Sequence, residues 1–249
     1  MLYGICNLSI ASLRSEPSDK SELISQILFG EHFKVLEKRK NWSKVRIAYD
    51  KFVGWVDNNQ YTEISEDKYK NLEGEDIIYS SDLVEFVENN SKELVPIVLG
   101  SSLSSLNLLY YSHDGSTITG KQSKEDLLNT AFLYLNAPYL SGGKTPFGID
   151  CSGFTQMVYK LNGYKLSREA SQQATQGEAL SFIEESEPGD LAFFDNADGD
   201  IIHVGIIMKD NYIIHAYGKV RIDRLDHSGI YNVDKKEHTH KLRVIKKII

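Results

Sequence analysis

Cys151 and two histidines, His203 and His215, are the residues of this 249-residue chain whose types and placement could perform nucleophilic chemistry. Cys151 follows a turn-rich run and precedes residues 154–161, where apolar side chains repeat at helical spacing. The sequence therefore predicts the cysteine at the first turn of a buried helix. Unpaired main-chain N–H groups and the helix dipole favour a thiolate at such a position. The alternative is a small buried cysteine that only packs.

His203 and His215 lie in two predicted strands joined by a short loop. Because side chains alternate along a strand, a hairpin at this loop puts both imidazoles on one face, almost opposite each other. The Cys151 helix can pack over that face, with His203 as the base and His215 as its orienting partner. The same three residues could instead bind zinc, or each histidine could be an ordinary core or surface residue. We expect His238 and His240 to face solvent.

The elements that must position these residues occupy residues 122–249. This region opens with a capping-box-like Ser123 and an apolar helical stripe over residues 127–135, and a shorter helix is predicted over residues 168–176. Strand signals follow over residues 190–194, 202–208, 212–216, 220–225 and 242–248. Helices first and an antiparallel sheet afterwards predict an α+β fold.

Residues 1–64 have the pattern of a small β-barrel. Its five short strands are predicted over residues 8–13, 24–28, 33–37, 42–47 and 52–56. Four segments occur in the order of a bacterial SH3-like domain, which this region resembles: Ala11-Ser12-Leu13-Arg14-Ser15-Glu16-Pro17, Gly30-Glu31, Trp42-Ser43-Lys44-Val45 and Gly54-Trp55-Val56. The barrel could also be purely structural, with no ligand of its own.

Residues 65–121 are interpreted as a second, degenerate SH3-like barrel or a linker domain. Their first ten residues are interpreted as a charged connector, and residues 76–89 are expected to hold a short helix. Further strands are predicted over residues 94–99, 106–111 and 117–119, the first of them with an edge proline.

The composition is that of an ordinary soluble protein, with 41% hydrophobic and 25% charged residues. A formal net charge of −7, without a basic patch, argues against nucleic acid or an anionic membrane as a partner. We find neither a leader nor a run of about 18 apolar residues. We therefore expect a cytoplasmic protein if the sequence is full length, and a periplasmic or extracellular one otherwise. The distant Cys6 and Cys151 predict free thiols.

Five motifs of the C-terminal region occur in a family-specific order: Tyr139-Leu140-Ser141-Gly142-Gly143, Asp150-Cys151-Ser152-Gly153-Phe154, Glu187-Pro188-Gly189-Asp190-Leu191-Ala192-Phe193-Phe194, His203-Val204-Gly205-Ile206 and Ile214-His215-Ala216. They resemble the NlpC family of cell-wall peptidases, which are papain-like cysteine peptidases that cut murein peptides. With the SH3-like region, the chain is similar to the γ-D-glutamyl-L-diamino acid endopeptidases, also called dipeptidyl-peptidase VI. The resemblance implies a papain-like (NlpC-type) domain over residues 122–249 that needs no metal and no cofactor.

The resemblance implies a role for each matching residue. Cys151 would be the nucleophile, His203 the general base and His215 the third, orienting residue. Tyr139 matches the family tyrosine whose hydroxyl lies beside the oxyanion. Ser141 stands where the family commonly has a tryptophan, a departure that leaves the three reacting residues unchanged.

Six further residues are candidates for substrate binding by the same resemblance: Asp150, Ser152, Glu31, Tyr61, Arg168 and Ser171. In related enzymes the SH3-like domain closes one end of the groove and reads the free amino terminus of the substrate. Asp150, Glu31 and Tyr61 are the candidates for that ammonium group. Arg168 would pair with the α-carboxylate of D-glutamate, although it could also be an ordinary surface residue.

The reaction implied is hydrolysis of L-Ala-γ-D-Glu-(L-diamino acid) peptides with a free amino terminus, releasing L-Ala-D-Glu. The murein peptide is the expected partner, with no nucleic acid and no membrane, and its diamino acid is meso-diaminopimelate or lysine. Two alternatives are open. One is a peptidoglycan-binding protein without catalysis, and the other is an amidase or acyltransferase that uses the same thiol chemistry on another substrate.

Overall fold

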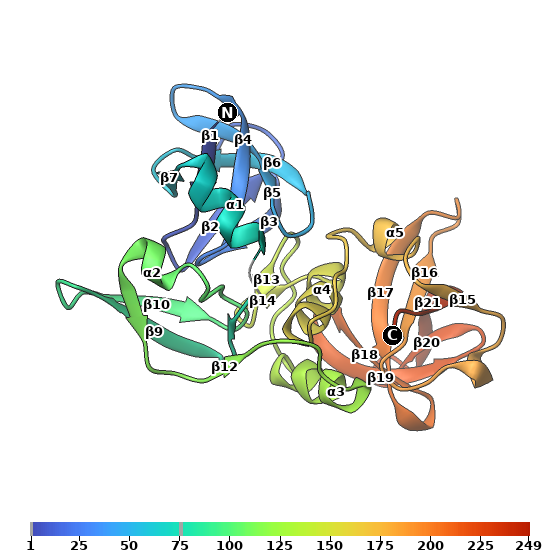
Figure 1. Cartoon of the computed structure of the whole chain (residues 1–249). Coiled ribbons are helices and arrows are strands. Elements are labelled where there is room, and N and C mark those ends of the chain that lie inside the picture. Colours follow the sequence, from blue (N-terminus) through green and yellow to red (C-terminus); the bar gives the residue numbers. More distant parts are fainter. Residues whose placement is uncertain (1, 75–76) are drawn as a thin grey trace. The chain divides into compact units, whose positions relative to one another are not determined.

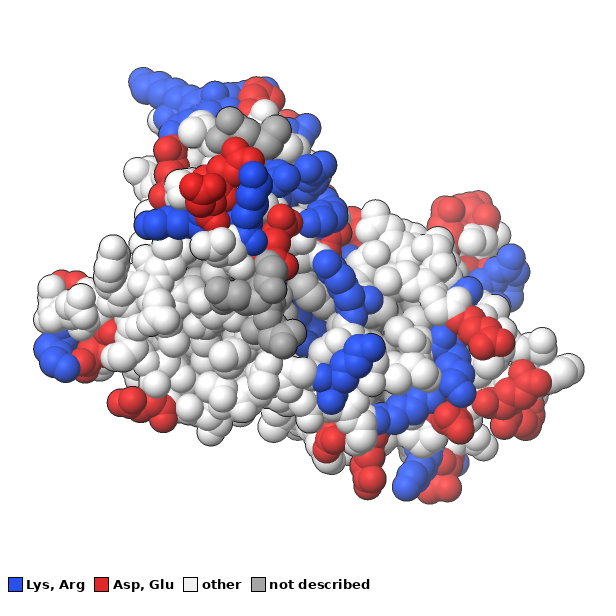
Figure 2. Space-filling view, in the orientation of Figure 1, with Lys and Arg blue, Asp and Glu red and all other residues white. Residues whose placement is uncertain are grey.

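The computed structural model describes residues 2–74 and 77–249 (Figure 1). The chain forms two compact units. Unit 1 comprises Met1–Gly120 with Ser141–Pro146, and unit 2 comprises Lys121–Leu140 with Phe147–Ile249. Lys and Arg side chains are interleaved with Asp and Glu on the surface in Figure 2, as expected for a chain with many charges of both signs.

A seven-stranded antiparallel sheet dominates unit 1. Its strands are β1 (Leu2–Ile5), β2 (Ile10–Arg14), β3 (Leu23–Leu28), β4 (His32–Lys38), β5 (Trp42–Ile47), β6 (Val53–Asp57) and β7 (Thr62–Ile64), in the order β3-β2-β6-β5-β4-β1-β7. Alternating buried residues such as Ala11, Leu13 and Phe33 fill its core. The predicted barrel strands are confirmed as β2 to β6, whereas β1 and β7, which pair with each other, were not predicted.

The rest of unit 1 corrects several sequence-based predictions. It holds α1 (Glu66–Gly74), β8 (Tyr79–Ser80), β9 (Val84–Asn89), β10 (Leu94–Val98), α2 (Leu106–Leu109), β11 (Tyr111–His113) and β12 (Thr117–Ile118). The expected charged connector is the helix α1. The strands form the sheets β10-β9-β11 and β12-β8.

Residues 77–89 contain strands rather than the expected short helix, while residue 76 of that prediction lies outside the described residues. Val87 of β9 is fully buried and pairs with Val95 of β10, so pairing between strands decides the local structure. The strand predicted over residues 106–111 is mostly the helix α2, because Leu106 and Leu109 pack into the cluster around Phe29 at helical spacing. The second SH3-like domain stays a prediction.

Unit 2 combines helices with a closed antiparallel sheet, which confirms the predicted α+β fold. The helices are α3 (Lys124–Leu133), α4 (Cys151–Leu161) and α5 (Ala170–Gln173), with 3₁₀ turns η1 (Ile183–Glu185) and η2 (Lys209–Asn211). The sheet order is β15-β21-β16-β17-β18-β19-β20, and β20 also pairs with β21 and so closes the sheet. The short β13 (Lys144–Thr145) belongs to unit 1, and β14 (Gly148–Ile149) to unit 2.

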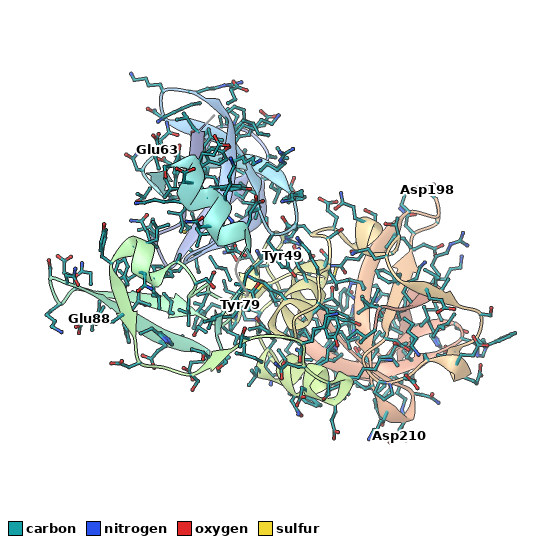
Figure 3. All side chains as sticks on the ribbon, viewed as in Figure 1. Tyr49, Glu63, Tyr79, Glu88, Asp198 and Asp210 are labelled. Atoms are coloured by element: carbon teal, nitrogen blue, oxygen red, sulfur yellow. The ribbon has the colours of Figure 1, made fainter. Side chains whose placement is uncertain are left out.

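The strands of this sheet are β15 (Glu178–Leu180), β16 (Leu191–Asp195), β17 (Ile201–Ile207), β18 (Tyr212–Tyr217), β19 (Lys219–Asp226), β20 (Gly229–Asn232) and β21 (Glu237–Lys247). The five predicted strands are confirmed, and β15 and β20 are additional. β21 begins five residues earlier than predicted, since its polar first half pairs with β20. Figure 3 labels Asp198 and Asp210, which mark the turns at the two ends of β17.

Candidate active site

Cys151 occupies the first position of α4, as the sequence predicts. Asp150 is the N-cap, with extended backbone angles of φ −92° and ψ 175°. Its Oδ1 accepts a hydrogen bond of 2.6 Å from the main-chain N–H of Gly153. The cap satisfies one of the free N–H groups of the first turn and fixes where the helix begins. The helix is buried along its whole length and packs against β17 and β18, the strands that carry the histidines.

The Cys151 thiol lies in an environment that keeps it protonated. Burial, followed by the charge of Asp150, raises the pKa of the thiol to about 12. A hydrogen bond from the main chain of Val204, next to His203, and the charge of Arg168 act in the opposite direction but are smaller. The expectation of a resting thiolate is therefore wrong, because burial, the largest effect on this thiol, favours the protonated form. A nucleophile at this position needs a base at the moment of attack.

The hairpin of β17 and β18 brings the two histidine rings together, but the pairing register of the two strands differs from the one expected. His215 pairs with Gly205 rather than with His203. A Cβ atom at Gly205 would lie 2.9 Å from the Cβ of His215, so the missing side chain leaves room for the ring. His203 Nε2 and His215 Nδ1 are 2.8 Å apart and form a hydrogen bond, with the rings nearly perpendicular at 82°.

Asp223 of β19 extends this pair and was not predicted. Its Oδ2 lies 3.1 Å from His215 Nε2, and both side chains are fully buried. A signal was present, since Asp223 stands at an inward position of a strand between the buried Val220 and Leu225. A buried carboxylate at such a position needs a partner. The partner could not be identified from the sequence, because Asp223 meets His215 only through the pairing of β18 with β19.

His240 corrects the expectation that both C-terminal histidines face solvent. Its ring stacks on the ring of His203, with centroids 4.2 Å apart and an interplanar angle of 26°. Burial, followed by the charge of His215, lowers the pKa of His240 to about 4. Closure of the sheet brings the polar start of β21 against the site. His238 is exposed and pairs with Asp226 at 2.9 Å.

Asp150, Ser152 and Arg168 form a second polar cluster beside the cysteine. Arg168 Nη2 lies 2.6 Å from Asp150 Oδ2 and Nη1 lies 3.0 Å from Oδ1, a two-point ion pair. Arg168 Nη1 also donates to Ser152 Oγ at 3.0 Å. Only 3% of Arg168 is exposed, so it is not a surface residue. Ser171 lies in the nearby α5 and is exposed.

Tyr139 lies on the segment before α4 and keeps a partly exposed hydroxyl-bearing ring. Its main-chain N–H donates to the carbonyl of Gly218 at 3.0 Å, and it bridges to Ile149. Burial first, and then the charges of Cys151 and Asp150, raise the pKa of the phenol. The phenol therefore stays protonated and can donate a hydrogen bond near the thiol.

Glu31 and Tyr61 belong to unit 1, whereas the other candidates belong to unit 2. Glu31 follows Gly30, whose φ of 75° forms the turn, but its carboxylate is buried. It accepts a hydrogen bond of 2.8 Å from Leu28 N–H and pairs with Lys144 Nζ at 3.3 Å. The Tyr61 hydroxyl lies 2.9 Å from Ser43 Oγ. Leu28, Lys144 and Ser43 also belong to unit 1.

Among the described residues, no group of three or more His, Cys, Asp or Glu side chains is arranged to hold a metal ion. His203 Nε2 and His215 Nδ1 form a hydrogen bond with each other. In the same described part of the chain, each helix is too short or too polar to cross a membrane.

Two family models match parts of this chain. Residues 136–239 match the NlpC/P60 family, and residues 13–60 match the bacterial dipeptidyl-peptidase Sh3 domain. The chain is 26% identical over 229 residues to the gamma-D-glutamyl-L-lysine dipeptidyl-peptidase of Bacillus cereus, covering 80% of this chain and 68% of that protein. It is 27% identical over 253 residues to dipeptidyl-peptidase 6 of Lysinibacillus sphaericus, covering 87% of this chain and 89% of that protein.

A solved structure shares the fold. The crystal structure of an NlpC/P60 family protein from Bacillus cereus aligns with a TM-score of 0.81 over 99% of both chains, at 20% identity. The papain-like, NlpC-type fold predicted from the motifs is thereby confirmed.

Proposed function

We propose that this chain is a cysteine peptidase, with an NlpC/P60 domain and a bacterial dipeptidyl-peptidase SH3 domain, that cleaves the γ-D-Glu–L-diamino acid bond of murein peptides. The substrate carries a free N-terminal L-Ala, and the product is L-Ala-D-Glu. The observation that carries the proposal is the buried Cys151 at the start of α4, against the strand of the hydrogen-bonded His203. Two relatives that match most of the chain carry dipeptidyl-peptidase names, which supports the substrate class.

In the proposed reaction, the sulfur of Cys151 attacks the γ-carbonyl carbon of D-glutamate. His203 takes the thiol proton during the attack, and the carbonyl oxygen becomes an oxyanion. The Tyr139 hydroxyl donates a hydrogen bond to that oxyanion. When the intermediate collapses, His203 gives the proton to the leaving amine of the diamino acid, and an acyl-enzyme remains. Water, activated by His203, then releases L-Ala-D-Glu and restores the thiol.

The resting state suits general-base catalysis. Burial holds the thiol of Cys151 protonated, and burial together with the charges of His215 and His240 lowers the pKa of His203 well below its usual value. A neutral imidazole beside a neutral thiol can accept a proton as the new bond forms. The proton transfer and the attack are therefore proposed to occur together.

The substrate's own charges fit the Asp150–Arg168 ion pair. We propose that the ammonium group of L-Ala binds Asp150, while the α-carboxylate of D-glutamate binds Arg168. Each substrate charge then takes over one half of a pair that is 2.6 Å apart in the free protein. Ser152, which hydrogen-bonds with both residues, would keep them oriented during the exchange. The roles of Glu31, Tyr61 and Ser171 in binding stay predictions.

The test uses purified protein and two peptides, L-Ala-γ-D-Glu-meso-diaminopimelate and its N-acetylated form, followed by mass spectrometry. We expect L-Ala-D-Glu from the free-amine peptide only, and none from the Cys151→Ala variant. Cleavage of both peptides would keep the peptidase and discard the amine-binding roles of Asp150, Glu31 and Tyr61. Binding of the peptides without turnover would replace the proposal with the non-catalytic alternative. The lysine-containing peptide, run in parallel, identifies the preferred diamino acid.

A further inference from the structure

The buried carboxylate of Asp223 is held from several directions at once. Arg221 donates to it through Nε, 2.7 Å from Oδ2, and through Nη2, 3.0 Å from Oδ1. The main-chain N–H of Val233 donates to Oδ1 at 3.1 Å, and Asn232 Nδ2 lies 3.5 Å from Oδ2. The remaining contact is His215 Nε2, 3.1 Å from Oδ2. Every one of these partners offers a hydrogen-bond donor, so the site is built for an ionised carboxylate.

The strand register explains how these groups come together. Arg221 of β19 pairs with His215 of β18, and Asp223 lies two residues further along the same face. Arg221 Nη2 also lies 2.8 Å from Asp234 Oδ2, which holds the guanidinium from the far side. The hydrogen bonds from His215, Arg221 and Val233 outweigh the effect of burial and lower the pKa of Asp223 to about 2. Asp223 is therefore ionised, and only an acceptor, at neutral pH.

An acceptor at this position determines where the protons are on both imidazoles. Burial lowers the pKa of His215, so the ring is neutral at pH 7 and has one N–H group. That group must be on Nε2, facing Asp223, which leaves Nδ1 of His215 as an acceptor. His203 Nε2, 2.8 Å away, must then carry its own proton. Nδ1 of the neutral His203 is left with a free lone pair, and this is the nitrogen that the thiol proton needs.

We propose that Asp223, clamped by Arg221, is a positioning residue that sets the tautomers of His215 and His203 and so leaves Nδ1 of His203 free to accept the proton of Cys151. This inference rests on the proposed peptidase mechanism and adds Asp223 and Arg221 to its residues. The negative charge of Asp223 also favours the imidazolium that forms on His203 during the attack, with His215 as the connecting ring. No bond to Asp223 forms or breaks.

A merely structural role for Asp223 is the competing explanation, because the Arg221 ion pair also ties β19 to residues 232–234. The Asp223→Asn variant separates the two. Val233 N–H and Arg221 Nη2 both donate at the Oδ1 position and hold the amide oxygen there. The N–H₂ group then takes the Oδ2 position, with loss of the hydrogen bond from Arg221 Nε, and faces His215 Nε2, which favours a proton on His215 Nδ1. His203 then carries its proton on Nδ1 and cannot accept from the thiol. In a serine protease, a wrong histidine tautomer lowers kcat about 10,000-fold. Asp223 lies one imidazole further from the nucleophile, so we expect Asp223→Asn to lower kcat about 100-fold and to change KM little.

Asp226→Asn is the matched control. Asp226 lies on the same strand, β19, and pairs with a histidine, His238, at 2.9 Å. Both partners of this pair are partly exposed, and the variant removes the same charge and the same kind of hydrogen bond. We expect its kcat to stay within about twofold of the parent protein, since exposed ion pairs contribute little.

Two readouts do not depend on the substrate. Nitrogen-15 NMR of the imidazoles in the unaltered protein should show His215 protonated on Nε2 and His203 on Nε2. Iodoacetamide labelling of Cys151, followed by peptide mass spectrometry across pH 5–9, should be at least about tenfold slower at pH 7 in Asp223→Asn than in Asp226→Asn. The other charged groups that face the site, Asp150, Arg168, His240 and Lys235, are the same in both variants.

The outcomes separate this inference from the proposed function. If the unaltered protein does not cleave the γ-linked peptide, the proposed function fails, while the NMR and labelling experiments still test Asp223. A proton on His215 Nδ1 in the unaltered protein would overturn the inference even if Asp223→Asn did not fold. A folded Asp223→Asn protein with the parent's labelling profile and kcat would overturn it as well.

Discussion

The two cysteines of this chain are both buried, but their environments are very different. Burial raises the pKa of each thiol to about 12. Cys6, in unit 1, lies in a core with Ala11 and Phe33, and its thiol donates to the carbonyls of Leu8 and Ile27 at 3.3 and 3.5 Å. It is a packing residue.

Cys151, in unit 2, begins a helix that packs against the strand of His203, and a charged pair lies beside it. Neither burial nor a high pKa distinguishes a nucleophile from a core residue. The difference is the set of neighbours, which for Cys151 includes the strand of His203, the proposed base.

The largest expected effect comes from removing each thiol in turn. Cys151→Ala should lower kcat/KM on the γ-linked peptide by about 10,000-fold, because the covalent route is lost. Cys6→Ala should leave kcat/KM within about twofold and lower the free energy of unfolding by about 1 kcal/mol, through a small cavity in the core. Steady-state kinetics and urea unfolding check both. Equal losses of activity in the two variants would contradict the division of roles.

A side chain at Gly205 would disturb the histidine pair without touching either thiol. In Gly205→Ala the new Cβ would meet Ile213 Cδ1 at 2.7 Å and His215 Cβ at 2.9 Å, so the ring of His215 must move. We expect kcat to fall about 100-fold, as for other small misplacements of catalytic groups, with a loss of about 1–3 kcal/mol in stability from overpacking. Gly199→Asn is the control, since Gly199 has φ +86° and open space around it. Full activity of Gly205→Ala would show that the histidine geometry tolerates a shift.

Acid should destabilise the fold through its buried histidines. Burial lowers the pKa of His32 to about 4, and it also lowers the pKa of His203 and His215. The unfolded chain binds protons at these residues near pH 6.5, and the folded chain does not. The contribution of these neutral histidines to the free energy of unfolding is therefore fully present above pH 6.5 and is lost as pH falls toward 4.

Urea unfolding at pH 7.5, 6 and 4.5 checks this dependence. His32 alone is expected to contribute about 2–3 kcal/mol of it. In His32→Gln, the loss of unfolding free energy that His32 causes in unit 1 at low pH should disappear. The loss that His203 and His215 cause in unit 2 should remain. A free energy of unfolding that does not fall between pH 7.5 and 4.5 would contradict the buried, neutral histidines.

The smallest expected effect separates the two C-terminal histidines. His240 stacks on His203, and an aromatic pair of this kind contributes about 1 kcal/mol. His240→Ala should therefore lower kcat about fivefold, because His203, the proposed base, loses the stacked ring that helps to orient its imidazole. His238→Ala, which removes an exposed histidine, should change kcat less than twofold. The reverse order in a steady-state assay would mean that the stacking has no role.

Local signals were sufficient for the parts of the site that lie within one element. Short stretches of sequence are enough to predict the cap at Asp150, the apolar repeat of α4 and the two strands on either side of residues 209–211. The register of the hairpin is not, because it depends on the backbone of η2, where Asp210 has a φ of 59°. Sequence alternation chose the correct face for His215 but the wrong partner residue.

The remaining site residues depend on contacts between distant strands. Asp223 reaches His215 only through the pairing of β18 with β19, and His240 reaches His203 only through the closure of the sheet by β21. The polar run around His240 looks like a solvent-facing tail when it is considered alone. The ionisation of Cys151 was predicted in the wrong direction for a related reason. The position of Cys151 at a helix start can be inferred from the sequence, but the degree of burial that raises the pKa of its thiol cannot.

The most direct test of the central claim is to trap the acyl-enzyme. The protein is mixed with L-Ala-γ-D-Glu-meso-diaminopimelate, quenched in acid within milliseconds to seconds, and digested for peptide mass spectrometry. We predict an L-Ala-D-Glu adduct on the peptide that contains Cys151, absent from the peptide that contains Cys6 and from the Cys151→Ala variant. An adduct on another residue, or cleavage by Cys151→Ala at the parent rate, would contradict the account.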